Sequence, residues 1–133
     1  MPIIHVQTRN HAEMVDITSQ ISAIIPADME SGICIVFSMH TTAGLTINEN
    51  ADPDVTKDIL FSLEKLVPWS NSKYLHREGN SAAHVKASLM GFSLTIPVSK
   101  GRLNMGTWQG VYFCEFDGPR NRTVSVKFIK SNP

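Results

Sequence analysis

A polar segment lies between an apolar stretch and a helix signal, and it contains side chains able to do chemistry. The segment covers residues 40–52, HTTAGLTINENAD. Imidazole and carboxylate groups transfer protons, whereas hydroxyl and amide groups bind polar substrates. A hydrogen-bonded turn and a helix cap account in part for Asp52. They account less well for His40, Asn48 and Glu49. We therefore expect a site in a loop here, formed from His40, Thr41, Thr42, Asn48, Glu49 and Asp52.

A second polar segment, residues 76–86 with the sequence HREGNSAAHVK, combines metal-ligand residue types with the features of an anion site. If residues 76–78 are extended, His76 and Glu78 share a face, because strand side chains alternate. The small turn that follows opens a helix whose free amides suit a phosphate group. We predict that the phosphate of a small metabolite is bound there by Asn80, Ser81 and Lys86.

Three imidazoles are of the right type to hold a transition metal such as zinc, while magnesium prefers the carboxylates. Their spacing matches no compact metal motif, so their convergence depends on the tertiary fold. We predict a divalent metal, zinc or magnesium, with the candidate ligands His40, His76 and His84. The candidate catalytic carboxylates are Glu49, Asp52 and Glu78.

A third segment, residues 101–110, is a loop punctuated by glycines that enters an apolar strand. Trp108 is interpreted as an anchor for this loop. The primary amide of Gln109 can donate and accept hydrogen bonds close to a ligand, so we include Gln109 among the substrate-binding residues. The sequence contains none of the hydrolase nucleophile, Walker or dinucleotide-binding patterns.

The segments that must position these residues are mostly strands. Apolar runs predict strands at residues 3–8, 32–40, 92–98, 109–116 and 123–129. Turn residues between the last two runs, 117–119, predict a hairpin. The connections between the last three strands are too short for crossover helices. We therefore expect an α+β fold, mainly an antiparallel β-sandwich.

Helices are predicted between these strands. Residues 17–25 fit a short helix, and residues 81–90 fit another that Gly91 closes. A longer helix begins at Asp52 and ends at Pro68. Its apolar stripe, which is expected to pack against a sheet, consists of Val55, Ile59, Leu63 and Leu66.

Composition predicts a single domain over residues 1–133. The chain is 42% hydrophobic, and its 12 basic residues balance its 12 acidic ones. This balance gives no bulk charge for binding nucleic acid or a membrane surface. We expect a cytoplasmic protein, since no export signal or apolar run near the ~20 residues of a membrane span is present. Cys34 and Cys114 are expected to be buried, reduced thiols.

Three segments resemble successive signature blocks of the YjbQ family, and the resemblance runs nearly end to end. They are HTTAGLTINENADPD, HREGNSAAHVKASLMG and IPVSKGRLNMGTWQGVYFCEFDGPR. The resemblance implies a jelly-roll-like β-sandwich with flanking helices that assembles as a homotrimer, with the polar clusters near subunit boundaries. It also implies a weak thiamine-phosphate synthase activity, which joins a pyrimidine diphosphate to a thiazole phosphate and releases pyrophosphate.

Three functions remain open for the same residues. The first is the transferase implied by the resemblance. The second is a metal-dependent hydrolase of a small phosphorylated or acyl compound, with the three histidines as ligands and Glu49 or Glu78 as general base. The third is a non-catalytic trimer that binds a phosphorylated metabolite.

Overall fold

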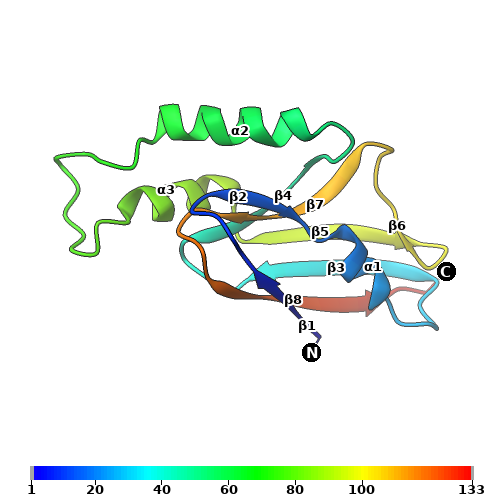
Figure 1. The fold of residues 1–133 in the computed structure, drawn as a ribbon. Helices are drawn as coiled ribbons and strands as arrows, with labels where there is room; N and C mark the ends of the chain where they lie inside the picture. Colours follow the sequence, from blue (N-terminus) through cyan, green and yellow to red (C-terminus); the bar gives the residue numbers. More distant parts are fainter. Residues whose placement is uncertain (1, 133) are drawn as a thin grey trace.

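A computed structural model describes residues 2–132, which form two sheets and three helices (Figure 1). The larger sheet contains, in spatial order, β1 (Ile3–Gln7), β8 (Asn121–Lys130), β3 (Ser31–Ser38), β5 (Ser93–Ser99) and β6 (Arg102–Leu103). The smaller sheet contains β2 (Glu13–Asp16), β7 (Gln109–Glu115) and β4 (Ala43–Glu49). All strand pairs are antiparallel, so the predicted α+β class with antiparallel pairing is confirmed.

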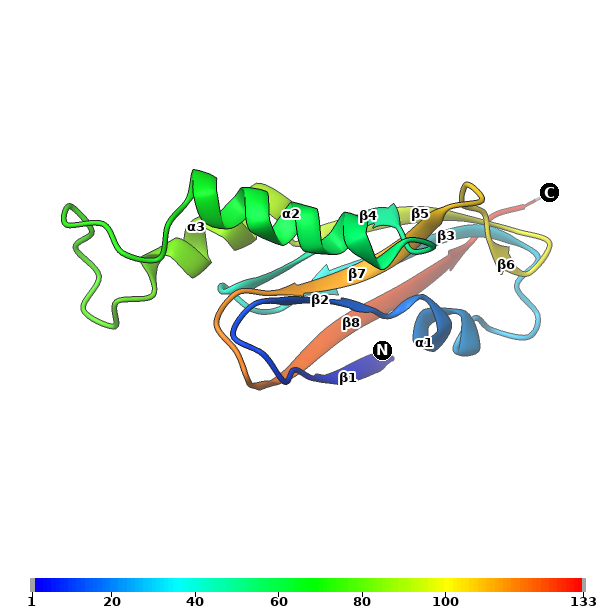
Figure 2. The ribbon, with the colours of Figure 1, turned by 45° about the horizontal axis from the view of Figure 1, so that its top comes forward.

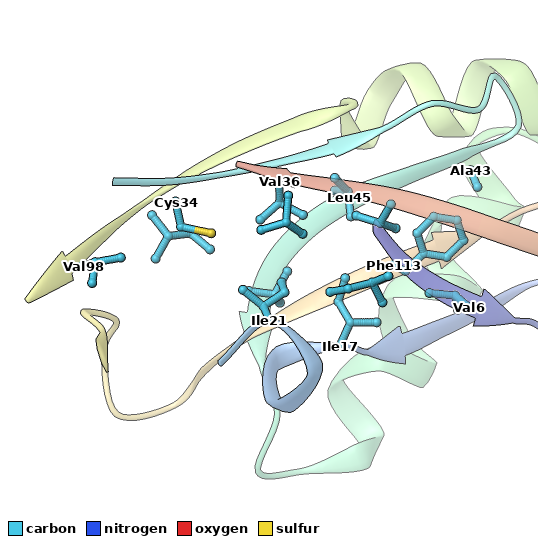
Figure 3. Packing of buried hydrophobic residues seen from close by; sticks show 14 of the residues in the cluster. Val6, Ile17, Ile21, Cys34, Val36, Ala43, Leu45, Val98 and Phe113 are labelled. Carbon is cyan, nitrogen blue, oxygen red and sulfur yellow. The ribbon is translucent and has the colours of Figure 1, made fainter. Parts of the chain in front are cut away.

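The main core receives apolar side chains from both sheets. Val36 of β3, Leu45 of β4 and Phe113 of β7 are fully buried and lie close together (Figure 3). The short helix α1 (Thr18–Ala23) adds Ile21 to the same core. Helix α1 lies within the predicted range 17–25.

Both cysteines are buried and free, as predicted. Burial raises the pKa of Cys34 to about 11 and that of Cys114 to about 12. Both are therefore protonated near neutral pH and behave as small apolar side chains.

Two helices, α2 (Pro53–Leu66) and α3 (Ser81–Met90), lie on one side of the molecule, against the smaller sheet (Figures 1 and 2). The Asp52 side chain caps α2 by accepting a 2.9 Å hydrogen bond from the Asp54 amide, as the sequence predicts. Leu63 packs against Tyr112 and Cys114. Leu66 is 75% exposed, so the apolar stripe ends one turn earlier than predicted.

Close packing of α3 on β4 depends on a glycine. A Cβ atom at Gly44 would lie 2.6 Å from the carbonyl oxygen of Gly91, which follows α3, and 3.0 Å from that of Ala87. No side chain fits in this gap, so Gly44 lets the helix approach the strand. This contact fixes α3 relative to β4, and both elements lead to the candidate site described below.

Two expectations about the strands are wrong. β7 and β8 do not form a hairpin, because β2 and β4 already occupy both edges of β7, and residues 116–120 carry the chain into the larger sheet. Residues 43–49, expected in a polar loop, instead form β4. Leu45 and Ile47 face the core from this strand while Asn48 is exposed, so the segment alternates like a half-buried strand.

Candidate functional site

A cavity of about 420 Å³, which we call the His–Arg cavity, is formed by three connections at one end of the molecule. The turn between β3 and β4, the β7–β8 connection and the start of α3 lie together there (Figure 1). Each connection supplies polar side chains. The charged and imidazole side chains that line the cavity are His40, His76, Glu78, His84, Asp117, Arg120 and Arg122.

Arg122 forms a buried ion pair with Glu115. The guanidinium Nε donates a 2.8 Å hydrogen bond to Glu115, and Nη2 donates to Glu115 and to Thr42 Oγ1. Burial opposes ionisation of Glu115, but hydrogen bonds from Arg122, Thr8 and the Asp117 amide outweigh it and lower the pKa. Glu115 is therefore ionised at neutral pH. These bonds use Nε–H and Nη2–H groups of Arg122, and the same residue lines the His–Arg cavity.

His40 lies in the turn between β3 and β4 and is held in one tautomer. Its Nε2 accepts a 2.9 Å hydrogen bond from the Thr123 amide, so Nδ1 carries the proton in the neutral ring. Burial lowers the pKa of His40, and the charges of Arg122 and Arg120 act in the same direction, while that of Glu115 opposes them. His40 therefore offers the cavity a neutral Nδ1–H donor.

A chain of polar contacts joins the β7–β8 connection to the start of α3. Arg120 donates to the Asp117 carbonyl at 2.7 Å and to its carboxylate at 3.0 Å. The same carboxylate accepts a 2.9 Å bond from Asn80 Nδ2, which also donates to Glu78 at 3.4 Å. This chain sets the position of Arg120 relative to α3.

His76, Glu78 and His84 form the outer side of the cavity. The segment that contains His76 and Glu78 is a turn rather than the extended strand considered above, with a 3.2 Å bond from the Gly79 amide to the His76 carbonyl. The turn still brings His76 Nε2 within 4.0 Å of Glu78 Oε1. The rings of His76 and His84 meet edge to face, with their centroids 5.4 Å apart.

The donors of this outer group are of the types that zinc uses, and they are close to one another. Within residues 2–132, however, no three His, Cys, Asp or Glu side chains are already arranged to hold an ion. His76, Glu78 and His84 would have to rotate towards a common centre. His40 fits less well as a ligand, because its Nε2 is engaged by the Thr123 amide.

Four of the predicted site residues lie far from this cavity. Asn48 and Glu49 end β4, next to Gly110 and Gln109 on β7, and Asp52 follows them as the cap of α2. The seven-residue strand β4 spans roughly 20 Å, so these residues lie at the opposite end from the turn that contains His40. The amide oxygen of Gln109 accepts a 2.8 Å bond from the Gly106 amide of its own loop.

The phosphate donors predicted on α3 also lie outside the cavity lining. Ser81 is the first residue of α3, and neither it nor Lys86 lines the His–Arg cavity. Lys86 is 4% exposed, and its ammonium pairs with Glu64 of α2. It thus joins the two helices. Thr41, Thr42 and Asn80, in contrast, do line the cavity.

Sequence reasoning missed four charged residues at the site: Glu115, Asp117, Arg120 and Arg122. They fall in the segment that ends β7 and starts β8, whose residue types predict only a strand end and a turn. The concentration of charge around this turn was the available signal. Charged residues in a turn are usually solvated, so the signal became informative only when the structure showed Glu115 and Arg122 buried.

No helix in residues 2–132 has both the length and the apolar character required to cross a membrane.

The chain is similar to several proteins from bacteria and archaea. The UPF0047 protein YugU of Bacillus subtilis is 48% identical over 127 residues, which cover 95% of this chain and 96% of that protein. The UPF0047 protein MJ1081 of Methanocaldococcus jannaschii is 50% identical over 125 residues, which cover 93% of this chain and 90% of that protein.

The chain is also similar to solved structures of proteins. A crystal structure of an uncharacterised conserved protein of the YjbQ/UPF0047 family from Clostridium acetobutylicum has a TM-score of 0.94 and 51% identity, covering 97% of this chain and all of that chain. The conserved hypothetical protein TT1486 of Thermus thermophilus has a TM-score of 0.91 and 40% identity, with coverage of 97% and 100%. The model for the family described as UPF0047 protein YjbQ-like matches residues 3–131. This chain therefore belongs to the YjbQ family, also called UPF0047.

Proposed function

We propose that the His–Arg cavity binds a small phosphorylated compound and promotes departure of pyrophosphate, as in thiamine-phosphate synthesis. The observation that supports this most strongly is the presence of two guanidinium groups and three imidazoles around one cavity of about 420 Å³. Guanidinium groups match the geometry of phosphate oxygens and bind them with paired hydrogen bonds. A cavity of this size accommodates a small metabolite.

The charge balance of the cavity favours a phosphate bound together with a divalent cation. Glu115 neutralises Arg122, Asp117 neutralises Arg120, and Glu78 adds one further negative charge. A phosphate dianion bound alone would add to this excess of negative charge unless an imidazole took up a proton. We propose that His76, Glu78 and His84 hold the cation. When bound, a divalent cation would offset the negative charge that develops on departing pyrophosphate.

The protein side chains have separate roles in this proposal. The Nη1 group of Arg122 and the guanidinium of Arg120 bind the phosphate oxygens. They stabilise the charge that appears there as the C–O bond to the pyrimidine compound breaks and the thiazole phosphate bonds to the same carbon. The Nδ1–H of His40 donates a further hydrogen bond. Glu115 and Asp117 hold the two arginines in place, so little reorganisation accompanies the reaction.

A metal-dependent hydrolase is the second candidate, because Glu78 lies beside His76. The Glu78 carboxylate lies 4.0 Å from the His76 imidazole, a side chain of the kind that binds metals. If His76 held a metal ion, Glu78 could act as the general base for a water bound to that ion. In this case, the phosphorylated compound would react with water alone. A non-catalytic role would show binding in the same cavity without any product.

We also propose that the chain forms a cytoplasmic homotrimer with the jelly-roll-like sandwich implied by its family resemblance. Exposed apolar side chains on the larger sheet support self-association: Phe37 is 45% exposed, Ile129 is 43% exposed, and Ile129 pairs with Ile33 across β8 and β3. Met39, which is 50% exposed, lines the His–Arg cavity near the same sheet. A contiguous group of exposed apolar side chains is typical of an interface.

Product analysis tests the proposed reaction. Purified protein is incubated with the pyrimidine diphosphate, the thiazole phosphate and magnesium, and pyrophosphate and thiamine phosphate are measured. Equal amounts of both products are expected, with at least about a tenfold loss in Arg120→Ala, which corresponds to ~1.4 kcal/mol of transition-state stabilisation. Arg102→Ala, an exposed arginine on the edge strand β6, is the matched control.

Other products would point to the alternatives. Loss of phosphate from the diphosphate without the thiazole compound would favour the hydrolase. Binding of the diphosphate with no product would favour the non-catalytic role. Absence of both binding and products would contradict the assignment of this cavity.

A further inference from the structure

The short segment that follows β1 lies beside the β7–β8 connection (Figures 1 and 2). Its first residue, Thr8, is 3% exposed and does not line the His–Arg cavity. The two segments approach so closely that a Cβ atom at Gly118 would lie 3.0 Å from Thr8 Oγ1 and 2.3 Å from the carbonyl oxygen of Asn10. No side chain fits between them, so Thr8 is in direct contact with the connection that carries Arg120.

Thr8 holds the main chain of Arg120 on both sides. The Thr8 amide donates a 2.9 Å hydrogen bond to the Arg120 carbonyl, and the Arg120 amide donates a 2.8 Å bond to Thr8 Oγ1. Because the amide and the carbonyl of Arg120 are both bound to one residue, the Cα atom of Arg120 is fixed. The guanidinium group, which is bonded to Asp117, therefore extends into the cavity from a fixed point.

The same hydroxyl group acts on Arg122 through Glu115. Thr8 Oγ1 lies 2.7 Å from Glu115 Oε1 and 3.1 Å from the Arg120 carbonyl oxygen. Its single proton is donated to the carboxylate, because a hydrogen bond to a charged acceptor is the stronger of the two. Glu115 Oε1 also accepts the 2.8 Å bond from Arg122 Nε. The Thr8 hydroxyl thus orients the carboxylate that holds Arg122.

We propose that Thr8 is a positioning residue for the phosphate site, and that it sets the spacing of the Arg120 and Arg122 guanidinium groups from outside the cavity. Two guanidinium groups bind one phosphate group well only where their spacing matches its oxygens. Thr8 is hydrogen-bonded to the main chain of one arginine and to the counter-ion of the other. Loss of its hydroxyl group therefore changes this spacing without removing a charge. This inference rests on the proposed function and adds a residue to its binding site.

Calorimetric titration of pyrophosphate with magnesium into Thr8→Val and Thr8→Ser tests the inference. Valine has nearly the shape of threonine but no hydroxyl group, so the affinity is expected to fall about fivefold or more, as for the loss of a hydrogen bond. Serine keeps the hydroxyl group, so the affinity of Thr8→Ser should stay within about twofold of wild type. Thr8→Cys, whose thiol is a weak donor, should lie between them and replaces Thr8→Val if that variant does not fold.

Thr18→Val is the matched control, because the Thr18 hydroxyl group makes the same kinds of bond away from the cavity. It donates a 2.6 Å bond to the Asp16 carboxylate and accepts a 2.8 Å bond from the Val111 amide. Thr18 begins α1, which lies far from the three connections that form the His–Arg cavity (Figure 1). Thr18→Val should therefore retain the wild-type affinity for pyrophosphate.

Combination with Arg120→Ala separates positioning from a general loss of stability. Because Thr8 acts partly through Arg120, Thr8→Val should weaken binding less in the Arg120→Ala protein than in the wild type. Wild-type affinity in Thr8→Val or Thr8→Cys, or a loss of the same size in Thr8→Ser or Thr18→Val, would overturn the inference alone. Failure of the wild type to bind pyrophosphate would overturn the proposed function and this inference with it.

Discussion

The carboxylate of Glu115 and the guanidinium of Arg122 form a buried ion pair that joins the two sheets beside the His–Arg cavity. Glu115 ends β7 of the smaller sheet and is 0% exposed, while Arg122, near the start of β8 of the larger sheet, is 5% exposed. Glu115 accepts hydrogen bonds from Nε and Nη2 of this guanidinium group, and Arg122 also lines the cavity. The same ion pair therefore holds the two sheets together and sets the position of Arg122 in the cavity.

Removal of one partner should destabilise the protein strongly. Glu115→Ala leaves the buried guanidinium of Arg122 without its counter-charge, which typically costs about 3–5 kcal/mol in the free energy of unfolding. Urea denaturation measures this quantity. Asp54→Ala removes a partner of Lys57 from a pair whose side chains are about three-quarters exposed, so a change below about 1 kcal/mol is expected. Similar losses in the two variants would contradict the structural role of Glu115.

Stability should fall as the solution becomes acidic. The folded-state pKa of His40 lies below its ordinary value of 6.5, so the unfolded chain takes up a proton first as the pH falls below 6.5. Glu115 acts in the same direction below its ordinary value of 4.5, because its folded-state pKa is also lowered. Both contributions are complete above 6.5 and are lost as the pH falls through the folded-state values.

Urea midpoints measured between pH 4 and pH 8 test this dependence. His40→Gln should flatten the decline that begins below pH 6.5, because the titrating imidazole is gone. The steeper loss below about pH 4.5, to which Glu115 contributes, should remain. A wild-type stability that rises as the pH falls from 6.5 would contradict the lowered pKa of His40.

Lys86 should contribute to stability rather than to phosphate binding. Its ammonium is buried and pairs with Glu64, so Lys86→Ala is expected to lower the free energy of unfolding by about 1–3 kcal/mol. The affinity for pyrophosphate should stay within about twofold of wild type. Lys57→Ala, an exposed lysine of α2, is the matched control for both measurements. A large loss of pyrophosphate affinity in Lys86→Ala alone would restore its predicted role in the site.

Self-association through the larger sheet predicts a mass of three chains of 14.7 kDa in solution. Phe37→Lys should shift the protein towards a single chain, because it places a charge among the exposed apolar side chains. Light scattering after size exclusion measures the mass. A wild-type protein that runs as one chain at micromolar concentration would contradict the proposed trimer.

Local signals in the sequence predicted the elements well where the pattern was strong. The range of α3 was predicted at both ends, and the Asp52 cap placed the start of α2, since capping is a property of adjacent residues. The sequence did not predict β4, because residues 46, 48 and 49 are polar and the segment resembles a loop. Its alternation of core-facing and outward-facing side chains is clear only from the structure, in which Leu45 lies in the core and Ile47 packs against it.

The site was only partly predictable because its members meet through tertiary contacts. His40, His76 and His84 do line one cavity, as their predicted convergence requires. Glu49 and Asp52 are near His40 in sequence, which predicts a common site, but β4 carries them away from it. Arg122 and Glu115 lie in different sheets, and the predicted hairpin would have placed them in one. No local pattern distinguishes these two arrangements.

The most direct test is calorimetric titration of pyrophosphate with magnesium into wild-type protein and two groups of variants. The first group, Arg120→Ala and His84→Ala, changes the His–Arg cavity, and the second, Glu49→Gln and Gln109→Ala, changes the opposite end. We predict at least about a tenfold weaker affinity in the first group and wild-type affinity in the second. Weaker binding in the second group only, or no binding by the wild type, would contradict the assignment of the His–Arg cavity as the phosphate site.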